Sequence, residues 1–323
     1  MTEQQEKNKA PVGDFQSLGA EVKCRATSDA PTFCNRVQET LELLSLFLHP
    51  SKTRPDKVYH FLSTHNNLAE QSLFLNLGYW ENAITYDKAC QDLAMLLGEA
   101  AELGPADTVL DAGFGFADQD VLWAERFCPQ KIIGLNITPL QIEVAKQRVE
   151  QAGLSDRIDL RFGSATDIAL ENESVDKVVC LESAFHFNTR ETFLHEAWRV
   201  LRPGGRLALA DIIPRKMPKA ITFEQRIKEA LGRVLWQIPD TNMYTAEVLD
   251  DKLKSAGFEN RRFRSISDNV FLPFRNFSRK RIQDPEIVRR LNPLLKLFWS
   301  VDHGEAEDDQ LLDYLIVTAE KTR

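Results

Sequence analysis

Between residues 108 and 213, short apolar runs alternate with longer segments whose apolar side chains recur at helical spacing. The apolar runs are TVLDAGF, KIIGLN, RIDLRFGSA, VDKVVCLES and GGRLALADII, and the segments between them include PLQIEVAKQRVEQAG and TRETFLHEAWRVL. Short apolar runs are typical of strands buried on both faces, and strands that alternate with helices form parallel sheets with right-handed crossovers. The pattern therefore predicts an α/β fold with a mostly parallel sheet covered by helices on both faces.

Outside this region the pattern favours helices. Helical spacing predicts helices over residues 35–50, 56–76 and 85–103, ahead of the first strand. Residues 215–245 carry no strand signal and predict a helical lid insertion over one end of the sheet. Residues 274–300 predict a further helical block, which lies between two closing strands, RRFRSIS and DYLIVTAEK.

These elements divide the chain into three parts. We expect a mobile N-terminal arm over residues 1–30, because this segment is polar and punctuated by Pro and Gly. A helical cap is expected over residues 31–83. The main α/β domain is expected over residues 84–323, and it contains the insertion and the helical block.

Composition and charge narrow the class of protein. The chain has 323 residues and a net charge of −8, so nucleic acid is not an expected partner. No apolar run reaches the roughly 18 residues that a membrane-spanning helix needs, and the N-terminus has no apolar signal region. We therefore expect no membrane span and a cytoplasmic location.

The cysteines and histidines do not form a metal-binding pattern. The five cysteines include no C-x-x-C pair, and the six histidines include no H-E-x-x-H motif. We therefore expect reduced cysteines and no bound metal.

A glycine-rich turn, Gly113-Phe114-Gly115, follows the first predicted strand. Glycine is needed where a Cβ would clash or where φ is positive, and ligands bind beside the carboxyl ends of parallel strands. A dinucleotide fingerprint would place its third glycine at position 118, which is Asp118. Because an acid there would repel a pyrophosphate, the turn favours a ligand without a phosphate.

Five motifs in register, within residues 76–321, resemble those of the class I S-adenosylmethionine-dependent methyltransferases. VLDAGFGF resembles the first motif, KIIGLNIT the second strand, FGSATDI the loop after the third strand, LESAFHF the segment after the fourth, and RVLRPGGRLALADI the fifth. The resemblance implies S-adenosylmethionine as the cofactor and a Rossmann-like sheet of seven strands. The residues that it implies for cofactor binding are Tyr79, Trp80, Asp111, Gly113, Gly115, Gln119, Asn136, Ile137, Gln141, Ser164, Ala165 and Glu182.

The resemblance also implies roles within this set. The first motif holds the methionine part of the cofactor, Asn136 bonds the ribose hydroxyls and Ser164 lies beside the adenine. Tyr79 and Trp80 are expected next to the sulfonium, where an aromatic face gains cation–π attraction. The family commonly has an acid at the position of Asn136, so this departure predicts weaker cofactor binding. It also commonly has a glycine at the position of Ala117, where a methyl group is expected to be tolerated, and an aspartate at that of Ser164.

LNLGYWE, GFGFADQD, CLESAFHF and SISDNV resemble, more narrowly, natural-product methyltransferases that act on a sugar hydroxyl of a macrolide-type scaffold. This resemblance implies O-methylation of a small-molecule acceptor. An alcohol acceptor needs a base near the working pH, and histidine titrates in that range. His186, after the fourth strand, is the best candidate, and His65 is the next. Asp211, which closes the fifth strand, is expected to assist His186 or to act as the base itself.

Two alternatives stay open. The first is C-methylation of an isoprenyl diphosphate or a sterol-like alkene, which needs aromatic side chains around a carbocation and cations for a diphosphate. Aromatic candidates for the pocket wall are Phe185, Phe187, Trp236 and Tyr244, and candidate cations are Arg226, Lys228 and Arg233. The second is a cofactor-binding protein without catalysis. The role of residues 1–50 is also open, between completing a lid and joining copies of the chain in a homo-oligomer.

Overall fold

A computed structural model describes residues 33–48, 68–216, 237–296 and 311–322. Within these ranges, none of the helices combines the length and the apolar character that crossing a membrane requires. Several sequence expectations lie outside the described residues. They are the N-terminal arm over 1–30, most of the lid insertion over 215–245, the last residues of the block over 274–300, and the candidates His65, Trp236, Arg226, Lys228 and Arg233.

The core of the fold is a sheet of seven strands in the order β3-β2-β1-β4-β5-β7-β6. The strands are β1 (Thr108–Ala112), β2 (Lys131–Asn136), β3 (Ile158–Phe162), β4 (Val175–Leu181), β5 (Leu201–Pro214), β6 (Glu259–Ser265) and β7 (Leu312–Glu320). Strands β1 to β5 pair in parallel, and β7 runs antiparallel between β5 and β6. The predicted fold class is therefore confirmed, down to the two closing strands.

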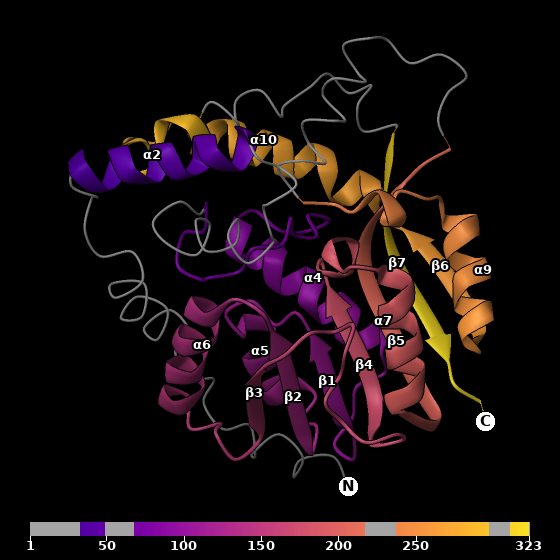
Figure 1. Ribbon diagram of the computed structural model, residues 1–323. Helices are drawn as coiled ribbons and strands as arrows, with labels where there is room; N and C mark the ends of the chain where they lie inside the picture. Colours follow the sequence, from indigo (N-terminus) through magenta and orange to yellow (C-terminus); the bar gives the residue numbers. More distant parts are fainter. Residues whose placement is uncertain (1–32, 49–67, 217–236, 297–310, 323) are drawn as a thin grey trace, which may run out of the picture.

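Helices cover both faces of this sheet (Figure 1). On one face are α4 (Tyr86–Ala100), α5 (Asp118–Arg126) and α6 (Pro139–Gln151), and on the other are α7 (Arg190–Val200) and α9 (Ala246–Ala256). Successive residues of one strand point to opposite faces. Accordingly, Val109 packs in the same cluster as Leu93 of α4, whereas Leu110 packs with Phe193 of α7. This double burial explains why the strands read as continuous apolar runs.

Helices also lie beyond the carboxyl ends of the parallel strands, where Figure 1 shows α2 (Phe33–Leu48) and α10 (Phe271–Arg281). Helix α2 is bonded to a later part of the chain, because Asn292 donates to Thr40 Oγ1 (3.1 Å). Helix α11 (Pro285–Arg290) follows α10, and short 3-10 helices are formed by η2 (Ala184–His186), η3 (Asp240–Asn242) and η4 (Ser267–Asn269). The predicted helices over 35–50 and 274–300 correspond to α2 and to α10 with α11. Helices α2, α10 and α11 therefore lie over the edge of the sheet at which a ligand is expected.

The helix predicted over residues 56–76 is wrong for its described part, which is irregular from residue 68 onward. Its backbone amides donate to side chains of the core instead of to carbonyls four residues earlier. The amide of Leu73 donates to Asp118 (3.3 Å), and the amide of the following Leu77 donates to Glu182 (2.8 Å). Partners that are distant in sequence satisfy these donors, so the segment needs no helical hydrogen bonds. The spacing of its apolar residues alone could not reveal this.

Candidate functional site

The strand order creates a crevice between β1 and β4. These strands are neighbours, but β2 lies on the far side of β1 and β5 on the far side of β4, so the loops after β1 and β4 diverge. Ligands of open parallel sheets bind at such a switch point. A cavity of about 260 Å³ lies here. This volume is just below the roughly 300–1,000 Å³ that is usual for small-molecule sites.

The glycine turn after β1 forms one wall of the cavity. Gly113 has a φ of +103°, and a Cβ at this position would overlap the side chain of Ser183. Gly115 has a φ of +55°, and its Cβ would meet no atom within 4 Å. Since Gly115 lines the cavity, a side chain there would stand in the space meant for a ligand. Ala117 adopts the same left-handed conformation (φ +62°), at a cost of roughly 1–2 kcal/mol.

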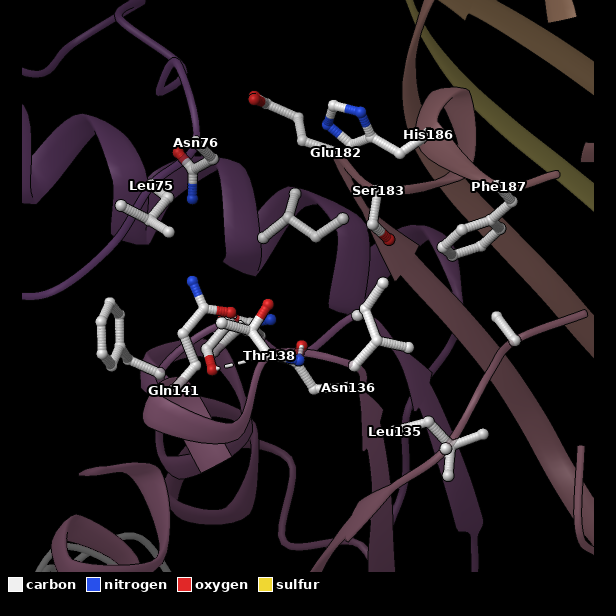
Figure 2. A pocket seen from close by; sticks show the side chains of 18 of the residues that line it. Leu75, Asn76, Leu135, Asn136, Thr138, Gln141, Glu182, Ser183, His186 and Phe187 are labelled. Atoms are coloured by element: carbon white, nitrogen blue, oxygen red, sulfur yellow. Dashed lines mark hydrogen bonds between the residues drawn. The ribbon is translucent and has the colours of Figure 1, made fainter. Parts of the chain in front are cut away.

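Polar side chains gather at one end of the cavity, where Figure 2 shows Asn136, Thr138 and Gln141 together. Asn136 donates from Nδ2 to the Gly115 carbonyl (3.2 Å) and to Gln141 Oε1 (2.8 Å), and its Oδ1 accepts from the Thr138 amide (2.9 Å). The donors of Asn136 are therefore used within the protein. Its Oδ1 has a second lone pair, which keeps it able to accept from a ligand hydroxyl.

Asp118, which follows the glycine turn, forms a buried ion pair with Arg148 of α6. The two guanidinium nitrogens lie 2.5 and 2.7 Å from the two carboxylate oxygens, and Arg148 also donates to the Phe116 carbonyl. The side chains are 1% and 9% exposed. The sequence argument that an acid at this position repels a phosphate is therefore wrong in its premise, because Arg148 compensates the charge.

Asp111, near the end of β1, is hydrogen-bonded to Gln119. It is absent from the described lining of the cavity, but its Oδ2 accepts a hydrogen bond from Gln119 Nε2 (3.0 Å), and Gln119 does line the cavity. Burial raises the pKa of Asp111 to about 7, and burial beside Asp111 raises the pKa of Asp120 well above its usual range. The hydrogen bond fixes which way the Gln119 amide faces.

The opposite end of the cavity carries Glu182 and His186, which follow β4 (Figure 2). His186 lies on the 3-10 turn η2 and is 8% exposed. The ring of Phe185 packs against it with centroids 4.0 Å apart, and Phe187 also lines the cavity. An imidazole is thus held at the edge of the cavity, across from the polar end formed by Asn136.

Glu182 connects three distant parts of the chain. It has a φ of +49°, and its Oε1 accepts from the Leu77 amide (2.8 Å) and from Tyr314 Oη (2.6 Å) of β7. Burial raises its pKa from the ordinary value of 4.5 to about 7, although both hydrogen bonds act in the opposite direction. Glu182 therefore links the segment before α4 to the sheet, at the wall of the cavity.

The raised pKa of Glu182 predicts a pH dependence of stability. The folded protein holds a proton that the unfolded chain releases between pH 4.5 and about 7, so the free energy of unfolding falls as the pH rises through this window. In Glu182→Gln, which keeps an acceptor for Leu77 and Tyr314, we expect this fall to be smaller by about 3 kcal/mol, at roughly 1.4 kcal/mol for each pKa unit. Urea unfolding at pH 5 and at pH 7.5 measures the difference. Equal falls in both proteins would contradict a raised pKa of Glu182. Some fall in stability should remain in Glu182→Gln, because the pKa of Asp111 is also raised to about 7.

Asp211 is paired with Arg190. Its carboxylate is buried, and its Oδ2 lies 2.8 Å from Arg190 Nε. The amides of Ile212 (3.0 Å) and Phe185 also stabilise the carboxylate. This differs from the expectation that Asp211 assists the imidazole of His186 or acts as the base. A buried carboxylate takes the nearest permanent cation, and here that cation lies at the start of α7.

Tyr79 and Trp80 are also absent from the described lining of the cavity. Trp80 stacks on Tyr86 of α4 with centroids 6.3 Å apart and lies 5.4 Å from the ring of Phe277 in α10. Tyr79 is 8% exposed, and its amide donates to the Ala89 carbonyl. The two aromatics pack the segment before α4 against the helices, which differs from the expected contact with the cofactor.

The other predicted site residues line the cavity together. They are Gly113, Gly115, Gln119, Asn136, Ile137, Gln141, Ser164, Ala165, Glu182 and His186. Sequence reasoning missed residues that complete the wall, among them Leu73, Phe74, Leu75, Asn76, Phe116, Asp118, Thr138, Thr166 and Ser183. Asn76 could have been identified as a site candidate, because it is a polar residue between Leu75 and Leu77 in an apolar run. Nothing local distinguishes the leucines of this run from core residues.

Comparison with known proteins agrees with this geometry. The model of a family described as "Methyltransferase domain" matches residues 110–209. The chain is 32% identical over 276 residues to erythromycin 3''-O-methyltransferase of Saccharopolyspora erythraea, covering 83% of this chain and 90% of that protein. It is 29% identical over 213 residues to 27-O-demethylrifamycin SV methyltransferase of Amycolatopsis mediterranei, covering 65% of this chain and 76% of that protein. The crystal structure of the [4+2]-cyclase SpnF shares the fold, with a TM-score of 0.67 and 22% identity over 83% of this chain and 97% of that one.

Proposed function

The chain belongs to the class I S-adenosylmethionine-dependent methyltransferases, and on this premise we propose that it methylates a hydroxyl group with His186 as the general base. Its cofactor is S-adenosylmethionine, and its relatives methylate natural products. The proposed acceptor is a hydroxyl on a sugar or a polyketide. The names of both relatives support this choice, since each specifies an oxygen position on such a product.

The residues of the cavity fit the cofactor. The open space at Gly115 leaves the backbone accessible, and Gln119, held by Asp111, provides an amide beside it. We assign the methionine part to this wall and the nucleoside to the end formed by Asn136 and Gln141. Asn136 Oδ1 would accept from a ribose hydroxyl without contributing a charge.

The bound cofactor supplies a methyl group on a positively charged sulfur. What the protein adds is position and a base. Apolar side chains such as Leu73 and Phe187 line the cavity and would exclude water around the reacting atoms, which strengthens local electrostatics. The walls of the cavity would hold the acceptor hydroxyl in line with the methyl group. His186 would accept the proton of that hydroxyl as the new C–O bond forms and the bond between the methyl carbon and sulfur breaks, which leaves a neutral thioether. Glu182 Oε1 already holds the Leu77 amide and Tyr314, so we assign it to the frame of the site.

One observation carries this proposal: His186 lines the same cavity as Gly113 and Gly115. The charged groups of the described lining are also informative, because no Lys or Arg is among them. Arg148, which is paired with a residue of this lining, is already bonded to the Asp118 carboxylate. A diphosphate needs cations, so this lining favours a neutral acceptor over an isoprenyl diphosphate. The cations considered from the sequence for that alternative belong to the insertion, outside the described residues.

The experiment that tests the proposal offers the purified protein labelled S-adenosylmethionine and two pools of acceptors. One pool holds glycosylated macrolides and free polyols, and the other holds isoprenyl diphosphates with Mg²⁺ together with sterols. Transfer of label to oxygen in the first pool is the expected result. Transfer only to carbon in the second pool would replace the proposal with C-methylation. Cofactor binding with no transfer to either pool, or to wider panels of both kinds, would favour a binding protein.

A further inference from the structure

We propose that Asn242 is a positioning residue, which holds the turn that carries His186 through hydrogen bonds to the carbonyls on both sides of it. Asn242 ends the 3-10 helix η3, far along the chain from η2. Its Nδ2 donates to the carbonyl of Phe185 (3.0 Å) and to that of Phe187 (2.7 Å). The residue between these two carbonyls is His186. The inference rests on the proposed function, because it assumes that the orientation of this imidazole matters.

The amide of Asn242 has one orientation that satisfies every neighbour. Its Oδ1 accepts from the backbone amide of Arg190 (2.9 Å), while its two Nδ2 hydrogens meet two carbonyls. A flipped amide would place an oxygen against two carbonyl oxygens and a nitrogen against an N–H. The side chain is 1% exposed, so water cannot replace a lost partner cheaply. Asn242 is therefore locked and rigidly fixes the turn.

Asn242 is itself held from the other side. The Arg190 guanidinium donates from Nη1 to the Asn242 carbonyl (3.1 Å) and forms an ion pair with Asp211. Two backbone hydrogen bonds within η2 and its flanks are local, from the His186 amide to the Ser183 carbonyl and from the Phe187 amide to the Ala184 carbonyl. The long-range contacts thus supply what a three-residue helix lacks, since such short helices have little stability of their own.

No feature of the sequence marked this residue. The stretch DTNMY lies at the end of the insertion predicted over residues 215–245, and asparagine is common in turns. The contact joins residues 55 and 57 positions apart. Only the fold brings them together.

The variants are chosen to separate positioning from general stability. Asn242→Ala removes all three side-chain hydrogen bonds, Asn242→Asp turns an oxygen toward the two carbonyls, and Asn242→Ser retains one donor. The matched control is Asn292→Ala, because Asn292 is equally buried (0% exposed) and is absent from the described lining of the cavity. Each protein is measured for thermal unfolding, for the affinity for S-adenosylmethionine, for kcat and for the NMR resonances of its histidines.

We expect Asn242→Ala to lower kcat on the order of 10- to 100-fold, as is usual when a reacting group is displaced by about 1 Å. Asn242→Asp is expected to lower it further and Asn242→Ser less, with cofactor affinity unchanged in all three. The His186 ring resonance, identified by its loss in His186→Ala, is expected to shift in each Asn242 variant that remains folded. It is expected to stay in place in Asn292→Ala. Adding Asn242→Ala to His186→Ala should cause no further loss of kcat.

Two failures are distinguishable. An unmoved His186 resonance and an unchanged kcat in folded Asn242→Ala or Asn242→Ser would overturn the positioning role. Full activity of His186→Ala would instead overturn the proposed base. A shifted His186 resonance in the Asn242 variants would then still show that Asn242 positions this turn in the unaltered protein. If Asn242→Ala lowers kcat by the same factor in the His186→Ala background as in the unaltered protein, the inference would also be contradicted, because Asn242 would then act independently of His186.

Discussion

Replacing His186 with alanine is expected to lower kcat by about 10²- to 10⁴-fold, the usual contribution of a positioned general base. The affinity for S-adenosylmethionine is expected to stay the same, because the glycine turn and Asn136, which we assign to the cofactor, lie on other walls of the cavity. A radiometric assay with saturating acceptor gives kcat, and equilibrium dialysis with the cofactor gives its dissociation constant. The acidic limb of the pH profile of kcat should flatten in the variant, since it reports the protonation of the base.

The matched control for this variant is His195→Ala. His195 lies on the exposed side of α7 and is absent from the described lining of the cavity. The same loss of a ring therefore occurs without a change at the site, and kcat should be unaffected. If His186→Ala keeps the activity of the unaltered protein, the acceptor is deprotonated by another group or needs no base. That result would favour a carbon acceptor, in which an alkene attacks the methyl group directly.

The sequence was sufficient for the parts of the site that depend on one strand and the loop after it. Gly113, Asn136, Ser164 and His186 each lie at or just after the carboxyl end of a strand, and parallel strands end at the same edge of the sheet. Their convergence on one cavity therefore follows from the order of the elements. The positive φ of the glycines could also be anticipated, because few other residues tolerate it.

The sequence was insufficient where the role of a side chain depends on its partner. Asp211 closes β5 as expected, yet its role is decided by Arg190, and neither residue carries a local sign of the pairing. In the same way, the sequence suggested an uncompensated acid at Asp118, whereas the fold pairs it with Arg148. Trp80 has the aromatic face that a sulfonium contact requires, but its ring packs against aromatic rings of α4 and α10. Such pairings are properties of the packed fold.

The ion pair between Arg190 and Asp211 is expected to cause the largest loss of stability when it is broken. Both side chains are essentially buried, at 0% and 1% exposure. Arg190→Met would leave the carboxylate of Asp211 without its cation, which typically costs about 3–5 kcal/mol of unfolding free energy. Urea unfolding measures this loss. It should be greater at pH 8 than at pH 5, because a buried carboxyl without its cation has a raised pKa and becomes less favourable in the folded state as it ionises.

The double variant Arg190→Met with Asp211→Asn separates the cost of the stranded charge from the loss of packing. Replacing the carboxylate with an amide removes the charge, so part of the stability should return and the added pH dependence should disappear. Lys88→Met is the control, because its ion pair with Asp92 is exposed and worth at most about 1 kcal/mol. A loss in Arg190→Met no greater than in Lys88→Met would mean that Asp211 is neutral in the folded protein. Arg190 would then hold η3 through its hydrogen bonds to the carbonyl and the side chain of Asn242, and the support of the His186 turn would not depend on the charge of Asp211.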